Sequence, residues 1–161
     1  MKFERAFVTM TGLGLAAVLA VAVSCKGTEN ETAPPAEASA GPAWKDMTRE
    51  QRGAFMKQHV LPEMKAAFAA FDAEEFGEMN CATCHGAGAK DKTFTMPNPK
   101  LPHLPTDDAG WKALEAKEPA AVKFMRETVV PRMAALLREA PYDPATHEGF
   151  GCFECHTPRP K

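Results

Sequence analysis

The chain has 161 residues, 45% hydrophobic and 25% charged, and its 21 acidic and 19 basic residues give a formal net charge of −2. This balance provides no excess of basic residues for binding nucleic acid, so we expect no nucleic-acid partner. The length is sufficient for one small folded domain in addition to short N-terminal segments.

The first 24 residues have the pattern of an export signal. Lys2 and Arg5 give a positive start, and residues 6–23 are mostly apolar and uncharged. A charged region followed by an apolar region is typical of a signal peptide. A retained membrane helix is the alternative, because the apolar run approaches the length that spans a bilayer. The threonines and glycines within the run disfavour that alternative.

The apolar run ends in Ala-Val-Ser-Cys at residues 22–25, which resembles the lipobox of bacterial lipoproteins. Ala22 replaces the large aliphatic residue that is usual three positions before the cysteine. The resemblance implies cleavage after residue 24 and lipidation of Cys25, whose acyl chains would anchor the protein to a membrane. We expect an exported lipoprotein facing the periplasm or the cell exterior; a plainly secreted form is the alternative.

Residues 26–43 are small, polar and proline-rich, without aromatic residues or a periodic apolar pattern. Such a segment cannot bury enough surface to fold. With Cys25 it is predicted to form a lipid-anchored flexible tether over residues 25–43. Residues 44–161 are then predicted to form the folded domain.

The folded domain should begin with a helix. Residues 48–51, Thr-Arg-Glu-Gln, have the form of a capping box. Apolar residues then recur at helical spacing through Val60. Pro62 must either start a new helix in its first turn or kink a longer one. The helical pattern continues from Met64 to Phe71.

Residues 80–86, Asn-Cys-Ala-Thr-Cys-His-Gly, place two cysteines three positions apart with a histidine directly after the second. Two thiols at this spacing can add to the vinyl groups of a haem, and the adjacent histidine can coordinate the iron. The pattern therefore predicts covalent haem attachment through Cys81 and Cys84, with His85 as the proximal ligand.

Residues 86–105 contain glycine and proline with little periodicity, so they should form a loop. Asp107 and Asp108 favour the start of another helix that runs through Trp111 and Leu114. No convincing alternating pattern of a strand appears in the sequence. The expected fold is mainly α, a small helical domain with long loops.

The second half of the domain repeats the first. Residues 55–64 read FMKQHVLPEM and residues 124–133 read FMRETVVPRM, at an offset of 69. The second copy is also expected to continue as a helix, from Met133 to Glu139. The domain is therefore predicted to be internally duplicated, with repeats over about residues 47–86 and 116–157.

A second Cys-x-x-Cys-His motif follows the second copy, with Cys152, Cys155 and His156 in the places of Cys81, Cys84 and His85. The four cysteines could instead form two short disulfides, one zinc site or redox-active dithiols. None of these uses requires a histidine at the same place in both copies. The pattern therefore favours two covalently attached haem c groups.

The distal iron ligand separates an electron carrier from a site that binds small molecules. Met64 and Met133 recur at matching places upstream of the two motifs and are the favoured distal ligands, because a thioether is a soft, neutral ligand that raises the reduction potential. The equally repeated Met56 and Met125 are interpreted as packing residues. Four unrepeated side chains are rivals for the distal position: Met96, His59, His103 and His147.

A methionine-bearing helix followed by a Cys-x-x-Cys-His motif, occurring twice, resembles the repeat of the multihaem cytochrome subunit of bacterial photosynthetic reaction centres. The resemblance covers residues 55–85 and 124–156, with two motifs here rather than four. It implies haem attachment at the four motif cysteines, proximal ligation by the two motif histidines and distal ligation by Met64 and Met133.

Two classes of function remain open. The leading hypothesis is a dihaem electron carrier, tethered to a membrane, that exchanges single electrons with redox partner proteins. The alternative is a haem enzyme, such as a peroxidase or small-molecule reductase, or a haem sensor, with one open coordination position. The chain shows no acid-base cluster that would favour the enzyme.

Overall fold

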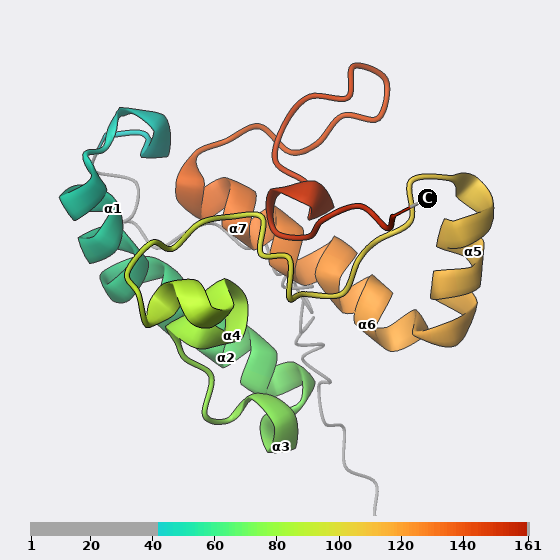
Figure 1. The fold of residues 1–161 in the computed structure, drawn as a ribbon, viewed down its shortest axis with the longest axis horizontal. Coiled ribbons are helices and arrows are strands. Elements are labelled where there is room, and N and C mark those ends of the chain that lie inside the picture. The colour runs from blue at the N-terminus through green and yellow to red at the C-terminus, as the bar shows by residue number, and fades with distance from the viewer. Residues whose placement is uncertain (1–41, 161) are drawn as a thin grey trace, which may run out of the picture. The chain divides into compact units, whose positions relative to one another are not determined.

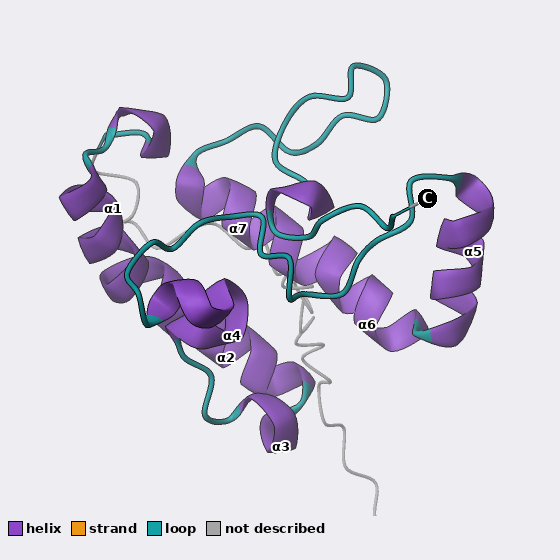
Figure 2. Cartoon of the chain, viewed as in Figure 1, coloured by secondary structure: helices purple, strands orange, loops and turns teal. Residues whose placement is uncertain are grey.

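A computed structural model describes residues 42–160, which consist of helices, turns and loops (Figures 1 and 2). Within this range the only β-structure is isolated bridges between single residues. The predicted mainly α fold with long loops is confirmed. The expected signal peptide, Cys25 and nearly all of the expected tether lie outside the described residues. Within the described range, no helix is long and apolar enough to span a membrane.

The first half is dominated by one helical rod. A 3₁₀ turn (Trp44–Asp46) precedes α1 (Arg49–Phe55), a π-helical stretch (Met56–Val60) and α2 (Leu61–Phe71). The predicted capping box is present, because the Gln51 N–H donates to Thr48 Oγ1 at 3.2 Å and the Thr48 N–H donates to Gln51 Oε1 at 2.8 Å. We call Met56–Val60 the first π segment.

The second half repeats this rod. After α5 (Asp108–Lys117) come α6 (Pro119–Phe124), a π-helical stretch (Met125–Val129), which we call the second π segment, and α7 (Val130–Leu137). Asp107 caps α5 as predicted, accepting a hydrogen bond from the Gly110 N–H at 2.8 Å. Helix α7 ends at Leu137 rather than at the expected Glu139, because Arg138 adopts a left-handed conformation with φ of 56°.

The two π segments explain how each rod accommodates its proline. A proline ring inside an α-helix clashes with the carbonyl four residues earlier and removes one hydrogen bond. Here the turn before each proline is widened: the Leu61 N–H donates to the Met56 carbonyl, and the Val130 N–H donates to the Met125 carbonyl. Each rod continues through its proline, at the same place in both repeats.

The two rods pack against each other where they carry these segments: α2 contacts the second π segment and α7 contacts the first. Glu63 and Arg132, which occupy equivalent positions of the repeat, form an ion pair with 2.8 Å between Oε1 and Nη1. Phe124 packs against Phe68 and stacks on Phe71, with ring centroids 5.0 and 4.3 Å apart. The repeated sequence therefore forms a two-fold-like pair of helical rods with reciprocal contacts.

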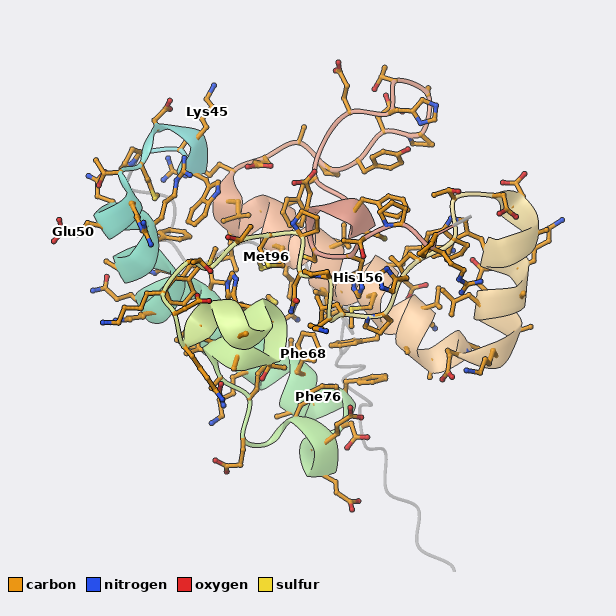
Figure 3. The ribbon with its side chains drawn as sticks, viewed as in Figure 1. Lys45, Glu50, Phe68, Phe76, Met96 and His156 are labelled. Carbon is orange, nitrogen blue, oxygen red and sulfur yellow. The ribbon has the colours of Figure 1, made fainter. Side chains whose placement is uncertain are left out.

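Short elements fill the connections between the rods and the motifs. Helix α3 (Ala73–Phe76) follows α2, and Phe76 packs edge-on against Phe68, both labelled in Figure 3. Helix α4 (Cys81–His85) contains the first motif and continues as a 3₁₀ turn (Gly86–Ala89) at the start of the expected loop. A final 3₁₀ turn (Cys152–Glu154) contains the first part of the second motif.

Candidate functional site

The first motif is held as a helical turn by its flanking residues. The Ala82 N–H donates to Asn80 Oδ1 at 2.9 Å, and the Asn80 N–H donates to Thr83 Oγ1 at 3.1 Å. This capping box fixes the start of α4. Cys81, Cys84 and His85 stand at positions i, i+3 and i+4 of one helical turn, so they share a face.

The second motif is a tighter and less regular turn. The backbone N–H groups of Cys155 and His156 both donate to the Cys152 carbonyl, at 3.3 and 2.9 Å. Gly151 precedes the turn and offers no capping side chain. The two motifs are therefore equal in sequence pattern but differ in local conformation.

The fold brings the inner cysteine of each motif to one apolar core. Cys84 and Cys155 are half-buried and pack against a core that contains Met64 and Phe68. In the structure all four motif cysteines are free thiols. In the described part of the chain, no three His, Cys, Asp or Glu side chains are grouped as a metal site would require.

Burial raises the pKa of three of the four motif thiols. Burial raises the pKa of Cys155 to about 12, with a further upward contribution from Cys84, and burial followed by Cys81 raises the pKa of Cys84. Burial also raises the pKa of Cys152, although Arg126 opposes it. Redox-active dithiols need a lowered pKa. These environments therefore disfavour the dithiol alternative.

A hydrogen bond from the ring of His156 fixes the orientation of this side chain. Its Nδ1 lies 2.9 Å from the Pro102 carbonyl oxygen, which can only accept, so Nδ1 carries the proton and donates. The lone pair is then on Nε2. A histidine that ligates a metal is typically held in this way by a backbone carbonyl.

His85 has a different environment. Its Nδ1 is buried and has no hydrogen-bond partner within the described residues. Burial lowers the pKa of His85, and the backbone of Phe94 opposes this effect. The ring of Phe94 packs edge-on against the imidazole, with centroids 5.4 Å apart. The two predicted proximal histidines therefore differ in how they are held: His156 has a hydrogen bond on Nδ1, and His85 has none there among the described residues.

The favoured distal methionines both reach the shared core. Met64 is buried, with 3% of its surface exposed, and the half-buried Met133 packs against the same cluster. Met56 and Met125, interpreted as packing residues, also pack against it. The apolar core thus gathers thioethers from both rods beside Cys84 and Cys155.

The rival ligands have other surroundings. His59 packs on Phe55 with ring centroids 4.9 Å apart. His103 Nδ1 lies 2.7 Å from Thr157 Oγ1, and the Tyr142 hydroxyl lies 2.9 Å from His147 Nδ1. Met96, labelled in Figure 3, is half-buried on the segment between α4 and α5 and does not belong to the core cluster.

That connecting segment binds the second motif, as Figure 1 shows where residues 95–105 run beside the C-terminal residues. The Asn98 N–H donates to the Cys155 carbonyl at 3.0 Å, and the Leu104 N–H donates to the Thr157 carbonyl at 3.0 Å. The Arg159 N–H donates back to the Leu104 carbonyl at 2.7 Å. A loop from the first half therefore supports the motif of the second.

Sequence reasoning missed several residues of this region. Pro102 and Asn98 act through hydrogen bonds that no motif indicates. Met79 and Phe150 were also missed; both are buried, and each lies two residues before the first cysteine of its motif. This matching position could have revealed the pair. Because a phenyl ring cannot coordinate iron, the shared property of the position is packing.

Comparisons of the chain with protein-family models, with curated proteins and with solved structures found no match.

Proposed function

We propose that this protein is a dihaem c-type cytochrome that carries electrons at a membrane surface. The observation that carries the proposal is the second motif's histidine. His156 follows two haem-attaching cysteines in sequence, and its Nδ1 donates to the Pro102 carbonyl, which leaves Nε2 available to a metal.

The residues present fit covalently bound haem. Cys81 and Cys84 would hold one haem and Cys152 and Cys155 the other, with His85 and His156 as proximal ligands. Met64 and Met133 are the proposed distal ligands. They are supported by the apolar core, to which Met64 belongs and against which Met133, Cys84 and Cys155 pack. Bound haem iron supplies reversible one-electron chemistry. The apolar core would exclude water from it and, with thioether ligands, favour the ferrous form.

The direct test counts haem per chain. Expressed with a haem-attachment system, the protein is expected to carry two haems that survive denaturation and acid-acetone extraction, measured by mass spectrometry and pyridine haemochrome absorbance. The double substitution Cys81→Ala/Cys84→Ala should leave one haem, and Cys152→Ala/Cys155→Ala should leave the other. Purified protein that contains zinc and no haem would contradict the proposal.

A haem enzyme or sensor is the second candidate, and one observation favours it. The two halves are unequal, because Met64 is buried whereas Met133 is half-buried, and because His156 has a hydrogen-bond partner on Nδ1 whereas the other motif histidine, His85, has none there among the described residues. If Met133 does not bind the second iron, exogenous ligands would reach it. Cyanide added to the ferric protein is expected to bind slowly at both haems of a carrier; fast binding at one haem would favour the enzyme or sensor.

The site of action is proposed from the N-terminal sequence. A lipid on Cys25 and the tether that follows would hold the domain at a membrane surface facing the periplasm or the cell exterior. The partners would be redox proteins that reach the same surface.

A further inference from the structure

Asn98 is unusual among the described residues, because it is the one polar or charged residue of residues 42–160 that is buried, with 5% of its surface exposed. A buried amide is costly unless its groups are hydrogen-bonded. Asn98 lies in the loop between α4 and α5.

Both ends of the Asn98 side chain are used. Nδ2 donates to the Cys84 carbonyl at 2.8 Å, and Oδ1 accepts from the Lys100 N–H at 2.9 Å. A carbonyl can only accept and a backbone N–H can only donate, so the amide has one possible orientation. Position 98 therefore requires a side chain that both donates and accepts, as asparagine does.

The backbone of the same residue binds the other motif. The Asn98 N–H donates to the Cys155 carbonyl at 3.0 Å. Cys84 and Cys155 are the second cysteines of the two motifs, so one residue ties together equivalent points of the two repeats. The oxygen that accepts in each case is the carbonyl directly before His85 or His156.

Gly86 leaves room for this contact. A Cβ at residue 86 would lie 3.0 Å from Asn98 Nδ2, and the φ of 56° at this position disfavours other residues. Glycine at residue 86 therefore lets the Asn98 amide pack against the first motif.

We propose that Asn98 is a positioning residue that fixes the two Cys-x-x-Cys-His motifs relative to each other and thereby sets the mutual orientation of the two haems. This inference rests on the proposed dihaem function. Asn98 acts through the backbone of the motifs, since its hydrogen bonds reach the carbonyls of Cys84 and Cys155 and no ligand side chain.

The test uses the full-length holoprotein and the variant Asn98→Asp. The variant keeps the shape of the side chain but replaces the donor to the Cys84 carbonyl with a carboxylate oxygen. The readout is circular dichroism in the Soret band, where two nearby haems give a couplet that depends on their mutual orientation. We expect Asn98→Asp to retain two covalent haems, while the couplet loses most of its amplitude or changes sign.

Two comparisons separate positioning from general stability. Asp107→Ala removes the cap of α5, a hydrogen bond to Gly110 that involves neither motif, and should lower the melting temperature while leaving the couplet unchanged. Asn98→Ser keeps a short side chain that can donate and should restore part of the couplet that Asn98→Asp loses.

The outcomes are distinct. A wild-type couplet in Asn98→Asp overturns the positioning role and leaves the dihaem function intact. Wild-type protein without two covalent haems overturns the proposed function, and the role of Asn98 with it. If the variants do not fold, hydrogen exchange of the wild-type holoprotein decides: a slowly exchanging Asn98 backbone amide supports the proposal, and one that exchanges as fast as an exposed loop amide overturns it.

Discussion

Individual side chains make sharply different contributions in this protein, and the methionines show it best. Met64 and Met133 follow the two prolines of the repeat, whereas Met56 and Met125 precede them and begin the two π segments. All four contact the same core. Burial alone therefore does not distinguish a ligand from a packing residue. The spectrum and reduction potential of a bound iron would distinguish them.

Substitution of the proposed distal ligands supplies that separation. Met64→Ala or Met133→Ala should remove the sulfur ligand from one haem of the two. The ferric near-infrared band should halve, and the reduction potential of that haem should fall, because a thioether ligand favours ferrous iron. Near-infrared absorbance and redox titration measure both effects.

Met56→Ala and Met125→Ala are the matched controls. They should leave the near-infrared band unchanged and cost only packing, at most about 2–5 kcal/mol in the free energy of unfolding. A band that halves in Met125→Ala and persists in Met133→Ala would show that Met125, and not Met133, is the second distal ligand. A band unaffected by all four substitutions would leave Met96 and the unrepeated histidines as the candidate distal ligands.

The helical rods are built on a repeated sequence, and they differ in charge at a position where equivalent residues meet. Glu63 and Arg132 are equivalent in the repeat, yet carry opposite charges and form an ion pair between the rods. Because equivalent positions of the two rods meet here, identical charged residues would repel each other. The duplicated halves therefore need to differ at this point.

Charge reversal tests this contact. Glu63→Arg should place two guanidinium groups together and lower the free energy of unfolding, while the double variant Glu63→Arg/Arg132→Glu should recover most of the loss. The side chains retain 28% and 23% of their exposure, so the pair is expected to contribute only about 1 kcal/mol. Chemical denaturation of the wild type, Glu63→Arg, Arg132→Glu and the double variant forms a double-mutant cycle. Additive effects would show that the two charges do not interact.

The whole protein is proposed to combine an anchor, a tether and a redox domain. The anchor lies outside the described residues, so its prediction rests on the sequence around Cys25. Lipid chains would confine the domain to a membrane surface, and the tether would set how far it reaches.

Cys25→Ala tests the anchor. The variant should escape lipid processing and appear either as soluble protein or as an unprocessed precursor, because the lipidated residue is gone. Cell fractionation and the mass of the N-terminus measure this, and the haem content should stay unchanged because Cys25 lies outside both motifs. Retention of Cys25→Ala in the membrane fraction at its mature mass would refute lipid anchoring.

Local sequence determined much of this fold. The capping box at Thr48, the cap at Asp107 and the helical spacing predicted helices that the structure contains, because these signals act within one turn of the chain. The repeat predicted two equivalent rods. It did not predict that each rod would pass its proline through a π segment, because the sequence allowed both a new helix and a kink.

The contacts that join the two motifs were decided by the tertiary structure alone. His156 is held by the carbonyl of Pro102, 54 residues earlier, and Asn98 reaches Cys84 with its side chain and Cys155 with its backbone. Backbone carbonyls and amides are present at nearly every residue, so a hydrogen bond to them leaves no pattern in the sequence. The sequence thus determined the residue types of each motif and the duplicated helix before it, whereas long-range packing of a loop decided which backbone groups hold the motifs in place.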